Sequence, residues 1–186
     1  MDYANHLKEI EKSLSVTPDF LSQEECDKLI QFIEDNKLND RSTFMPNLGL
    51  KGDVGNYEAI GITPSNYPDI YNEVFKNKLR NGFEPYEIQI NKYEEGHFIP
   101  PHTDKGINLY TVCVPLQTDS KNNVVFGDPD AFYDGISVEE SDKNGMTISF
   151  PDVKGCGYQF NGTKPIHWVP PTNSLRYSAI ILYGLT

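Results

Sequence analysis

The sequence predicts a mainly β fold with flanking helices, an α+β chain whose strands form a barrel or a sandwich. Short segments rich in β-branched and aromatic residues follow one another through the second half of the chain. They are separated by Gly, Pro, Asn and Asp, as is typical of such folds. Helical spacing of apolar residues is confined to the first half. At 186 residues the chain can bury a core of its own, so we expect one domain over residues 1–186.

Three helices are expected in the N-terminal part. Residues 2–14 are expected to form a short polar helix. Ser22 and Glu25 have the spacing of a capping box, which predicts that a second helix begins there and runs over 23–37. A third helix is expected over 67–81, ended by an Asn-Gly pair.

The predicted organisation is a mostly helical part, 1–82, followed by a β core, 83–186. Residues 40–57 are rich in Gly and Asn, which fits a lid over a site and fits a plain surface loop equally well. The strands are expected at 86–93, 97–103, 108–117, 123–126, 146–150, 157–160, 166–169 and 176–184.

The candidate metal ligands begin with the run His102-Thr103-Asp104. On an extended strand, residues i and i+2 point to the same face, so His102 and Asp104 can bind one metal ion together. Two prolines directly before the run exclude a regular helix there. Taken alone, the run is better explained by a solvated loop with one histidine and one aspartate, and the metal interpretation depends on residues further along the chain.

A second histidine and an arginine complete the candidate site. His167 would add a second imidazole, and two imidazoles with one carboxylate are the facial triad that binds non-haem Fe(II). Arg176 opens an apolar, β-prone segment, where a buried charge needs a partner. That partner is either one of the 27 acidic residues, in a structural salt bridge, or the carboxylate of a ligand. Ser178 lies on the same strand face as Arg176 and can add a hydrogen bond.

The chain has four histidines, and the other two are weaker ligand candidates. His6 lies in a polar segment and is expected to be solvated. His97 is the main competitor, but no carboxylate follows it at the i+2 position. We expect His97 to flank the site or to line its entrance.

Two segments of the chain resemble the metal-binding stretches of the 2-oxoglutarate/Fe(II)-dependent dioxygenases, and the prolyl 4-hydroxylase-like branch most of all. Residues 88–104 look like the first stretch, with its strand, tyrosine, glycine and His-x-Asp. Residues 167–178 look like the second, with its distal histidine, Val-Pro and following basic residue. Residues 20–30 resemble the start of the helix that often precedes the core in this branch.

The resemblance implies a double-stranded β-helix, the jelly-roll core of these oxygenases, with helices packed on one face. It also implies that His102, Asp104 and His167 are the Fe(II) ligands and the catalytic centre.

The implied co-substrates are 2-oxoglutarate and O2, with ascorbate as an optional support. The far carboxylate of 2-oxoglutarate would pair with Arg176, assisted by Ser178 and Tyr93. The implied reaction is hydroxylation of an unactivated C–H bond, in a prolyl or similar residue of a protein or peptide, with release of succinate and CO2.

Other functions remain open at this stage. A small-molecule hydroxylase of the same superfamily would share every residue of the site. A metal-binding β-barrel without oxygen chemistry, such as a cupin-like isomerase or a zinc hydrolase, would leave Arg176 without a role. A non-catalytic binding module on the same fold would be expected to have lost at least one ligand.

The composition of the chain indicates which kinds of partner and which cellular compartment to expect. The net charge is −11 and no basic run occurs, which argues against nucleic-acid binding. Three cysteines, an odd number without a C-x-x-C, predict free thiols in a reducing compartment. No signal peptide or apolar membrane segment is recognised, so we expect a cytoplasmic protein without a membrane partner. The expected partner is a peptide, protein or small-molecule substrate, and the oligomeric state is not predicted.

Overall fold

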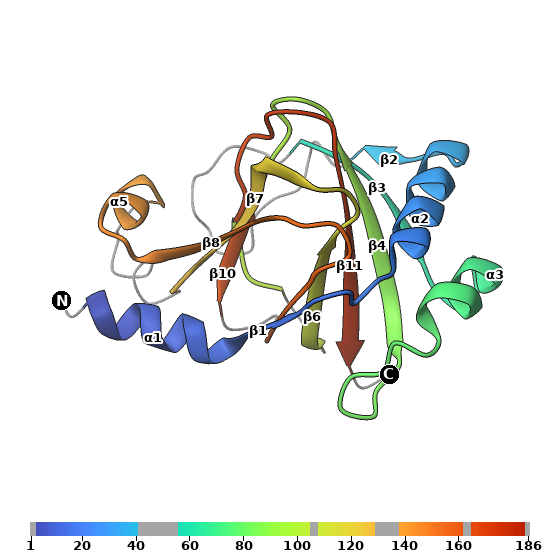
Figure 1. Cartoon of the computed structure of the whole chain (residues 1–186), viewed down its shortest axis with the longest axis horizontal. Helices are drawn as coiled ribbons and strands as arrows, with labels where there is room; N and C mark the ends of the chain where they lie inside the picture. The colour runs from blue at the N-terminus through green and yellow to red at the C-terminus, as the bar shows by residue number, and fades with distance from the viewer. Residues whose placement is uncertain (1–2, 41–55, 105–107, 129–137, 162–164, 185–186) are drawn as a thin grey trace.

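The strands form two facing antiparallel sheets, as expected for a jelly roll. A computed structural model describes residues 3–40, 56–104, 108–128, 138–161 and 165–184. The larger sheet has the order β1-β9-β6-β11-β4-β3-β2, and the smaller has the order β5-β10-β7-β8 (Figure 1). The prediction of a mainly β fold with a jelly-roll core is therefore confirmed.

The strands are β1 (Leu14–Thr17), β2 (Asn39–Asp40), β3 (Glu58–Ile62), β4 (Pro85–Tyr93), β5 (Ile99–His102), β6 (Asn108–Pro115), β7 (Asp119–Gly127), β8 (Thr147–Asp152), β9 (Gly157–Phe160), β10 (Ile166–Val169) and β11 (Arg176–Gly184). The helices are α1 (Tyr3–Ser13), α2 (Gln23–Asp35), α3 (Pro68–Ile70), the π-helical turn η1 (Tyr71–Phe75) and α5 (Val138–Lys143).

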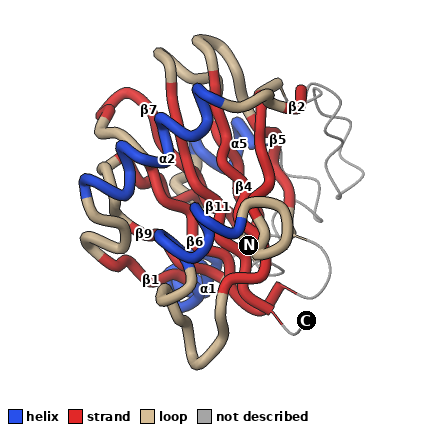
Figure 2. Tube along the Cα trace, turned by 90° about the vertical axis from the view of Figure 1, so that its right-hand side faces the viewer, coloured by secondary structure: helices blue, strands red, loops and turns tan. Residues whose placement is uncertain are grey.

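The outer face of the larger sheet is covered by α2 and by α3 with η1. Figure 2 views the molecule from this side. The capping box forms as predicted, because the Ser22 hydroxyl accepts from the Glu25 amide and the Glu25 carboxylate accepts from the Ser22 amide. Apolar residues of α2 pack against alternate residues of the central strand β11, and both sets are buried. The helix contributes Cys26, Leu29 and Ile33, and the strand contributes Tyr177, Ala179, Ile181 and Tyr183.

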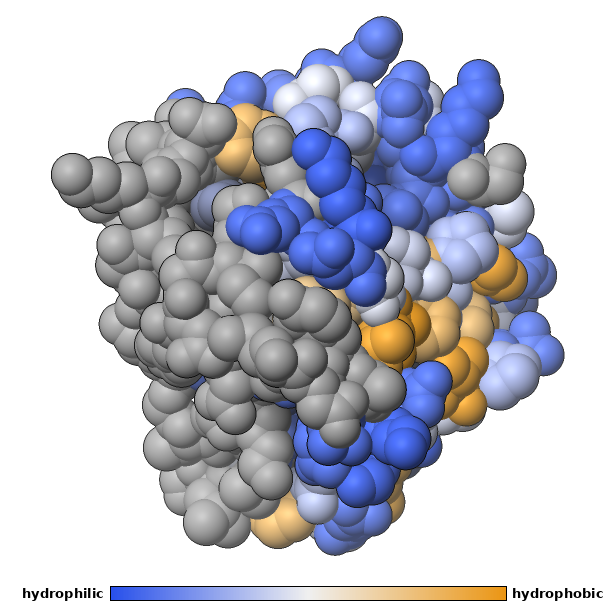
Figure 3. Space-filling view, turned by 90° about the vertical axis from the view of Figure 1, so that its left-hand side faces the viewer, coloured by the Kyte–Doolittle hydropathy of each residue, from blue (hydrophilic) through white to orange (hydrophobic). Residues whose placement is uncertain are grey.

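A second apolar cluster lies between the sheets. It contains Cys113 of β6, Phe126 of β7 and Phe160 of β9, and Ile10 of α1 packs against it. Because side chains alternate along a strand, the residues of β11 that do not face the helices point toward the space between the sheets. Arg176 and Ser178 are among these residues. Figure 3 shows the side of the molecule opposite α2, where apolar residues form a small area with hydrophilic residues above and below it.

The expected helix over 67–81 is wrong in its second half. Helical structure ends at Phe75, and Asn81 and Gly82 have φ values of 49° and 84°. They form a two-residue turn, since Arg80 and Phe83 exchange both backbone hydrogen bonds across it. Asn-Gly is the signature of a type I′ hairpin turn, which needs positive φ at both residues, as well as of a helix end.

The N-terminal part contributes strands that were not expected from the sequence. β1 pairs with β9, β3 pairs with β4, and β2 extends the sheet beyond β3. Of the proposed lid at 40–57, residues 41–55 lie outside the described residues. None of the described helices is long and apolar enough to cross a membrane.

Candidate metal centre

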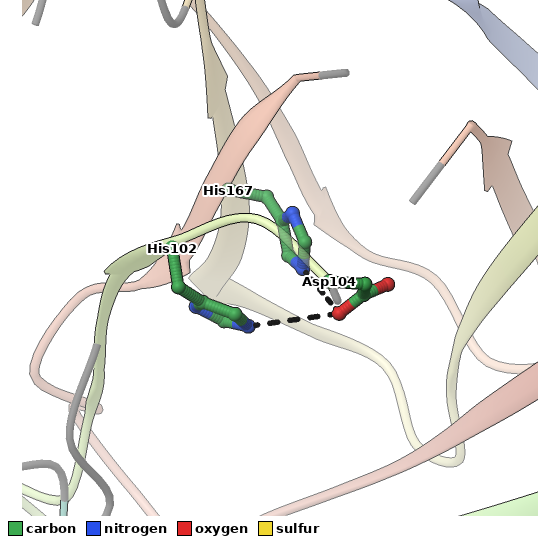
Figure 4. Close-up of side chains that lie close together, drawn as sticks. All are labelled: His102, Asp104 and His167. Carbon is green, nitrogen blue, oxygen red and sulfur yellow. Dashed lines mark ion pairs between the residues drawn. The ribbon is translucent and has the colours of Figure 1, made fainter. Parts of the chain in front are cut away.

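Two antiparallel strands of the smaller sheet bring the predicted metal ligands together. His102 ends β5, His167 lies on β10, and the two residues are direct partners in the register. Asp104 lies two residues after His102, just beyond the end of β5. All three side chains point toward one another (Figure 4). The structure therefore groups these residues as the sequence predicted.

The distances suit a shared ion. Oδ1 of Asp104 lies 3.6 Å from Nε2 of His167 and 4.0 Å from Nε2 of His102. The three ligand atoms all lie within 4.8 Å of one another. Nδ1 of His102 is 2.8 Å from the Pro100 carbonyl, and Nδ1 of His167 is 3.3 Å from the Pro165 carbonyl. These contacts favour the tautomer with hydrogen on Nδ1, which turns the Nε2 lone pair of each ring toward the common point.

The protonation states also suit metal binding. Burial lowers the pKa of His102 to about 3, with the neighbouring His167 acting in the same direction, so this ring is neutral at pH 7. Burial alone would raise the pKa of Asp104, but His167 and a hydrogen bond from Thr111 outweigh it and hold this pKa below its ordinary value. Neutral imidazole and ionised carboxylate are the forms that bind metal. Because His102 is neutral, its approach to Asp104 is a polar contact rather than a salt bridge.

Thr111 orients the carboxylate ligand. Its hydroxyl donates to Oδ2 of Asp104 at 2.6 Å, which leaves Oδ1 facing the two histidines. The sequence analysis missed this residue. The signal was available, because Thr111 is a polar residue in the otherwise apolar strand 110–114, but its partner could not be read from the sequence.

The donor set fits Fe(II). Two imidazoles and one carboxylate gathered on one side of a point form the facial arrangement of non-haem iron oxygenases, which leaves other coordination positions open. These ligands also line a cavity of about 250 Å³. The cavity is further lined by Gln89, Asn91, Tyr93, Cys113 and by apolar residues of both sheets, including Ile99, Val124, Phe160, Ile180 and Leu182.

Tyr93 lines this cavity, and its phenol is held in place by polar and aromatic neighbours. The Asn91 amide donates to the Tyr93 hydroxyl at 3.0 Å, and the Tyr57 ring stacks on the Tyr93 ring at a centroid distance of 5.6 Å. Burial raises the pKa of Tyr93 well above its ordinary value. The phenol therefore stays protonated and is able to donate a hydrogen bond.

Arg176 is fully buried and already has a carboxylate partner. Its Nε lies 2.6 Å from Oδ2 of Asp152, and its Nη2 lies 3.0 Å from Oδ1. Its guanidinium carbon lies 5.0 Å from the centroid of the Tyr93 ring, and Nη1 lies 3.5 Å from Oγ of Ser178. Arg176 and Ser178 are not among the described residues that line the cavity. Of the two partners considered for Arg176, the structural salt bridge is therefore present.

The ion pair joins the two sheets, because Asp152 ends β8 and Arg176 begins β11. Burial alone would lower the pKa of Arg176, but the Asp152 carboxylate more than reverses this, so the guanidinium keeps its charge. Burial raises the pKa of Asp152, while Arg176 opposes that rise. The sequence analysis did not single out Asp152, since nothing local distinguishes it from the other acidic residues.

His97 lies outside the metal cluster formed by the described residues. Its Nδ1 accepts from the Glu94 amide at 3.1 Å, and its own amide donates to the Glu94 carbonyl, so it stabilises the turn after β4. The side chain of His6 lies outside the described part of the structure.

Comparison with known proteins identifies the fold. No family model matches the sequence, and neither does any curated protein. A prolyl-4-hydroxylase from Pseudomonas putida superposes with a TM-score of 0.62 at 16% identity, over 98% of this chain and 99% of that one. An oxidoreductase of the 2OG-Fe(II) oxygenase family from Burkholderia pseudomallei superposes with a TM-score of 0.68 at 13% identity, over 98% of this chain and 89% of that one. A prolyl hydroxylase from Trichoplax adhaerens, in complex with a hypoxia inducible factor peptide fragment, superposes with a TM-score of 0.62. The two sequences are 9% identical, and the match covers 98% of this chain and 88% of that one.

These likenesses show that the chain has the fold of 2-oxoglutarate/Fe(II) oxygenases. The expectation drawn from the sequence resemblance is confirmed at that level.

Proposed function

We propose that this protein is an Fe(II)- and 2-oxoglutarate-dependent dioxygenase that hydroxylates an unactivated C–H bond. The observation that carries the proposal is the convergence of His102, Asp104 and His167 on one point of the cavity that they line. The jelly-roll fold shared with the oxygenases supports the same conclusion.

The residues of the cavity have distinct tasks in this proposal. His102, Asp104 and His167 would hold Fe(II), which when bound supplies oxygen activation coupled to conversion of 2-oxoglutarate into succinate and CO2. Asp104 provides the negative charge, and Thr111 keeps the carboxylate turned toward the metal position. The apolar walls of the cavity keep water away from the reaction.

The co-substrate is expected to extend from the metal position toward Tyr93 and Arg176. The Tyr93 hydroxyl accepts from Asn91, so its own hydrogen is available to donate to the far carboxylate of 2-oxoglutarate. Arg176 would supply the charge for that carboxylate, with Ser178 beside it. Its existing pairing with Asp152 affects this role.

The favoured substrate is a prolyl or similar residue of a protein or peptide. This choice rests on the fold likeness to the prolyl hydroxylases from P. putida and T. adhaerens, the second of which holds a peptide fragment. A small-molecule substrate is the second candidate, because the cavity is small, at about 250 Å³.

The test is an anaerobic titration of the metal-free protein with Fe(II) and then with 2-oxoglutarate. The weak visible charge-transfer band of the chelated complex should appear in the wild type and be absent in His167→Ala. Proline-containing peptides should then stimulate succinate formation that requires Fe(II). A folded, iron-loaded protein that gives no band at any concentration of 2-oxoglutarate would overturn the proposal.

A further inference from the structure

The side chains of Arg176 and Asp152 form a pair with no exposure to solvent. Asp152 uses both of its oxygens and engages the edge of the guanidinium made by Nε and Nη2. A guanidinium has five N–H donors, so three remain, on Nη1 and Nη2. The contact between Nη1 and Ser178 is long at 3.5 Å and satisfies them poorly.

Two residues of the cavity wall, Tyr93 and Cys113, lie next to Arg176, which does not itself line the cavity. Cys113, which lines the cavity, lies near enough to Arg176 for the guanidinium charge to act on its thiol. Tyr93, also in the cavity wall, lies opposite Arg176 in the register between β4 and β11. A carboxylate in the cavity would have to pass Tyr93 and Cys113 to meet Arg176 on its Nη1 side, because Asp152 occupies the edge made by Nε and Nη2.

Charge makes the two carboxylates competitors. The charges that act on Asp152 are Arg176, which favours the carboxylate form, and Asp119, which disfavours it. One buried cation paired with one buried anion is neutral overall, so little net charge remains to attract another anion. Two carboxylates that share one site also repel each other, so one of them must be displaced or take up a proton.

We propose that Asp152 is an internal carboxylate that neutralises Arg176 and thereby sets the affinity and selectivity for the 2-oxo acid co-substrate. This inference rests on the proposed function. The far carboxylate of 2-oxoglutarate has to share Arg176 with Asp152 or displace Asp152 from it. As a result, 2-oxoglutarate binds weakly, and a 2-oxo acid that lacks the far carboxylate binds almost as well.

The first test measures the dissociation constant of 2-oxoglutarate from the charge-transfer band of the anaerobic Fe(II) protein. In Asp152→Asn the amide keeps one acceptor for Arg176 but removes the competing charge. We expect the dissociation constant of 2-oxoglutarate to fall about tenfold or more. The far carboxylate of the ligand can then form a charge-assisted pair with Arg176 without a competing anion. Asp35→Asn, which removes an exposed carboxylate of α2, should leave the dissociation constant unchanged.

If Asp152 only positions Arg176, the same variant should bind 2-oxoglutarate equally well or less well, and the inference is then overturned. In that case the wild-type band still supports the proposed function. A band that forms in Asp152→Asn at 2-oxoglutarate concentrations too low to give one in the wild type supports the inference. Absence of the band from both iron-loaded proteins overturns the proposed function and this inference with it.

A measurement on the wild type keeps the test valid if Asp152→Asn does not fold. The dissociation constants of 2-oxoglutarate and 2-oxopentanoate, which lacks the far carboxylate, are compared by the same band. A neutralised Arg176 predicts that they differ by less than about tenfold, since a free buried guanidinium would favour the dicarboxylate far more. A larger preference for 2-oxoglutarate overturns the inference.

Discussion

At the scale of single residues, Thr111 fixes the orientation of the Asp104 carboxylate. Its hydroxyl donates to Asp104 at 2.6 Å from a fully buried position on β6. Groups that orient a metal ligand usually contribute tenfold to a hundredfold to metal affinity. We therefore expect Thr111→Val, which keeps the shape but removes the hydroxyl, to weaken Fe(II) binding by about tenfold to a hundredfold in an anaerobic titration.

Thr147→Val is the matched control for this substitution. The Thr147 hydroxyl also donates to a carboxylate, that of Asp142, but at an exposed site away from the metal ligands. The control should bind Fe(II) as the wild type does. Equal affinity in Thr111→Val and Thr147→Val would show that Asp104 needs no such support.

Cys113 gives a pH prediction at the same scale. Burial raises the pKa of its thiol from 9.0 to about 12. The unfolded chain therefore forms the thiolate at a lower pH than the folded protein does. The contribution of the Cys113 thiol to the free energy of unfolding is therefore complete below pH 9. It is lost as the pH rises from about 9 to about 12. At pH 10 the loss from this group is roughly 1 kcal/mol.

Urea unfolding of the wild type and of Cys113→Ala at pH 8 and pH 10 measures this loss. The alanine variant is less stable at both values because it leaves a small cavity, so the comparison is between the two pH-dependent changes. The wild type should lose roughly 1 kcal/mol more than the variant over this interval. Identical changes would mean that Cys113 titrates as it does in the unfolded chain.

At the scale of elements, Gly155 fixes the connection between β8 and β9. Its amide donates to the Pro115 carbonyl, and its carbonyl accepts from the Leu21 amide, so it ties the start of α2 to the sheet. Its φ is +78°, and a Cβ at this position would lie 2.2 Å from the Leu21 carbonyl oxygen. The clash is with backbone rather than with the end of a flexible side chain, so no side-chain movement can relieve it.

Gly155→Ala should therefore destabilise the protein much more than Gly82→Ala. Gly82 has a similar φ of +84°, but a Cβ there would meet nothing within 4 Å. We expect the free energy of unfolding to fall by about 1 kcal/mol in Gly82→Ala, because of the positive φ alone, and by about 3 kcal/mol or more in Gly155→Ala. Urea denaturation measures both, and equal losses would refute the steric argument.

The elements that were predicted correctly are those with a local cause. The capping box of α2 and the later strands follow from neighbouring residues, since both depend on spacing within a few positions. The strand at Leu14–Thr17 could not be predicted, because its partner is β9 at the other end of the chain. The Asn81-Gly82 turn was assigned to a helix end because the same residue pair serves both structures, and only the pairing of Arg80 with Phe83 decides between them.

The candidate site was predictable to a similar extent. The grouping of His102 and Asp104 follows from strand geometry, and His167 was joined to them by resemblance and by its residue type. The partner of Arg176 was not predictable, because 27 acidic residues were available and only the packing of one sheet on the other brings Asp152 to it.

At the scale of the whole molecule, the pair of Arg176 and Asp152 is a polar contact inside the space between the two sheets. Removing one partner from a buried ion pair leaves an unpaired buried charge, which costs about 3–5 kcal/mol, whereas replacing both partners with apolar residues is often neutral. Arg176→Met should therefore lower the free energy of unfolding by about 3–5 kcal/mol. The double variant Arg176→Met with Asp152→Leu should recover most of this loss.

Urea unfolding of the wild type, both single variants and the double variant completes a double-mutant cycle. Recovery in the double variant would show that the pair is not needed to hold the sheets together. The ion pair would then be retained for what it does at the cavity, in agreement with a role for Asp152 toward the co-substrate. A double variant as unstable as Arg176→Met would instead make the pair a structural link between the sheets, because apolar packing could not replace it.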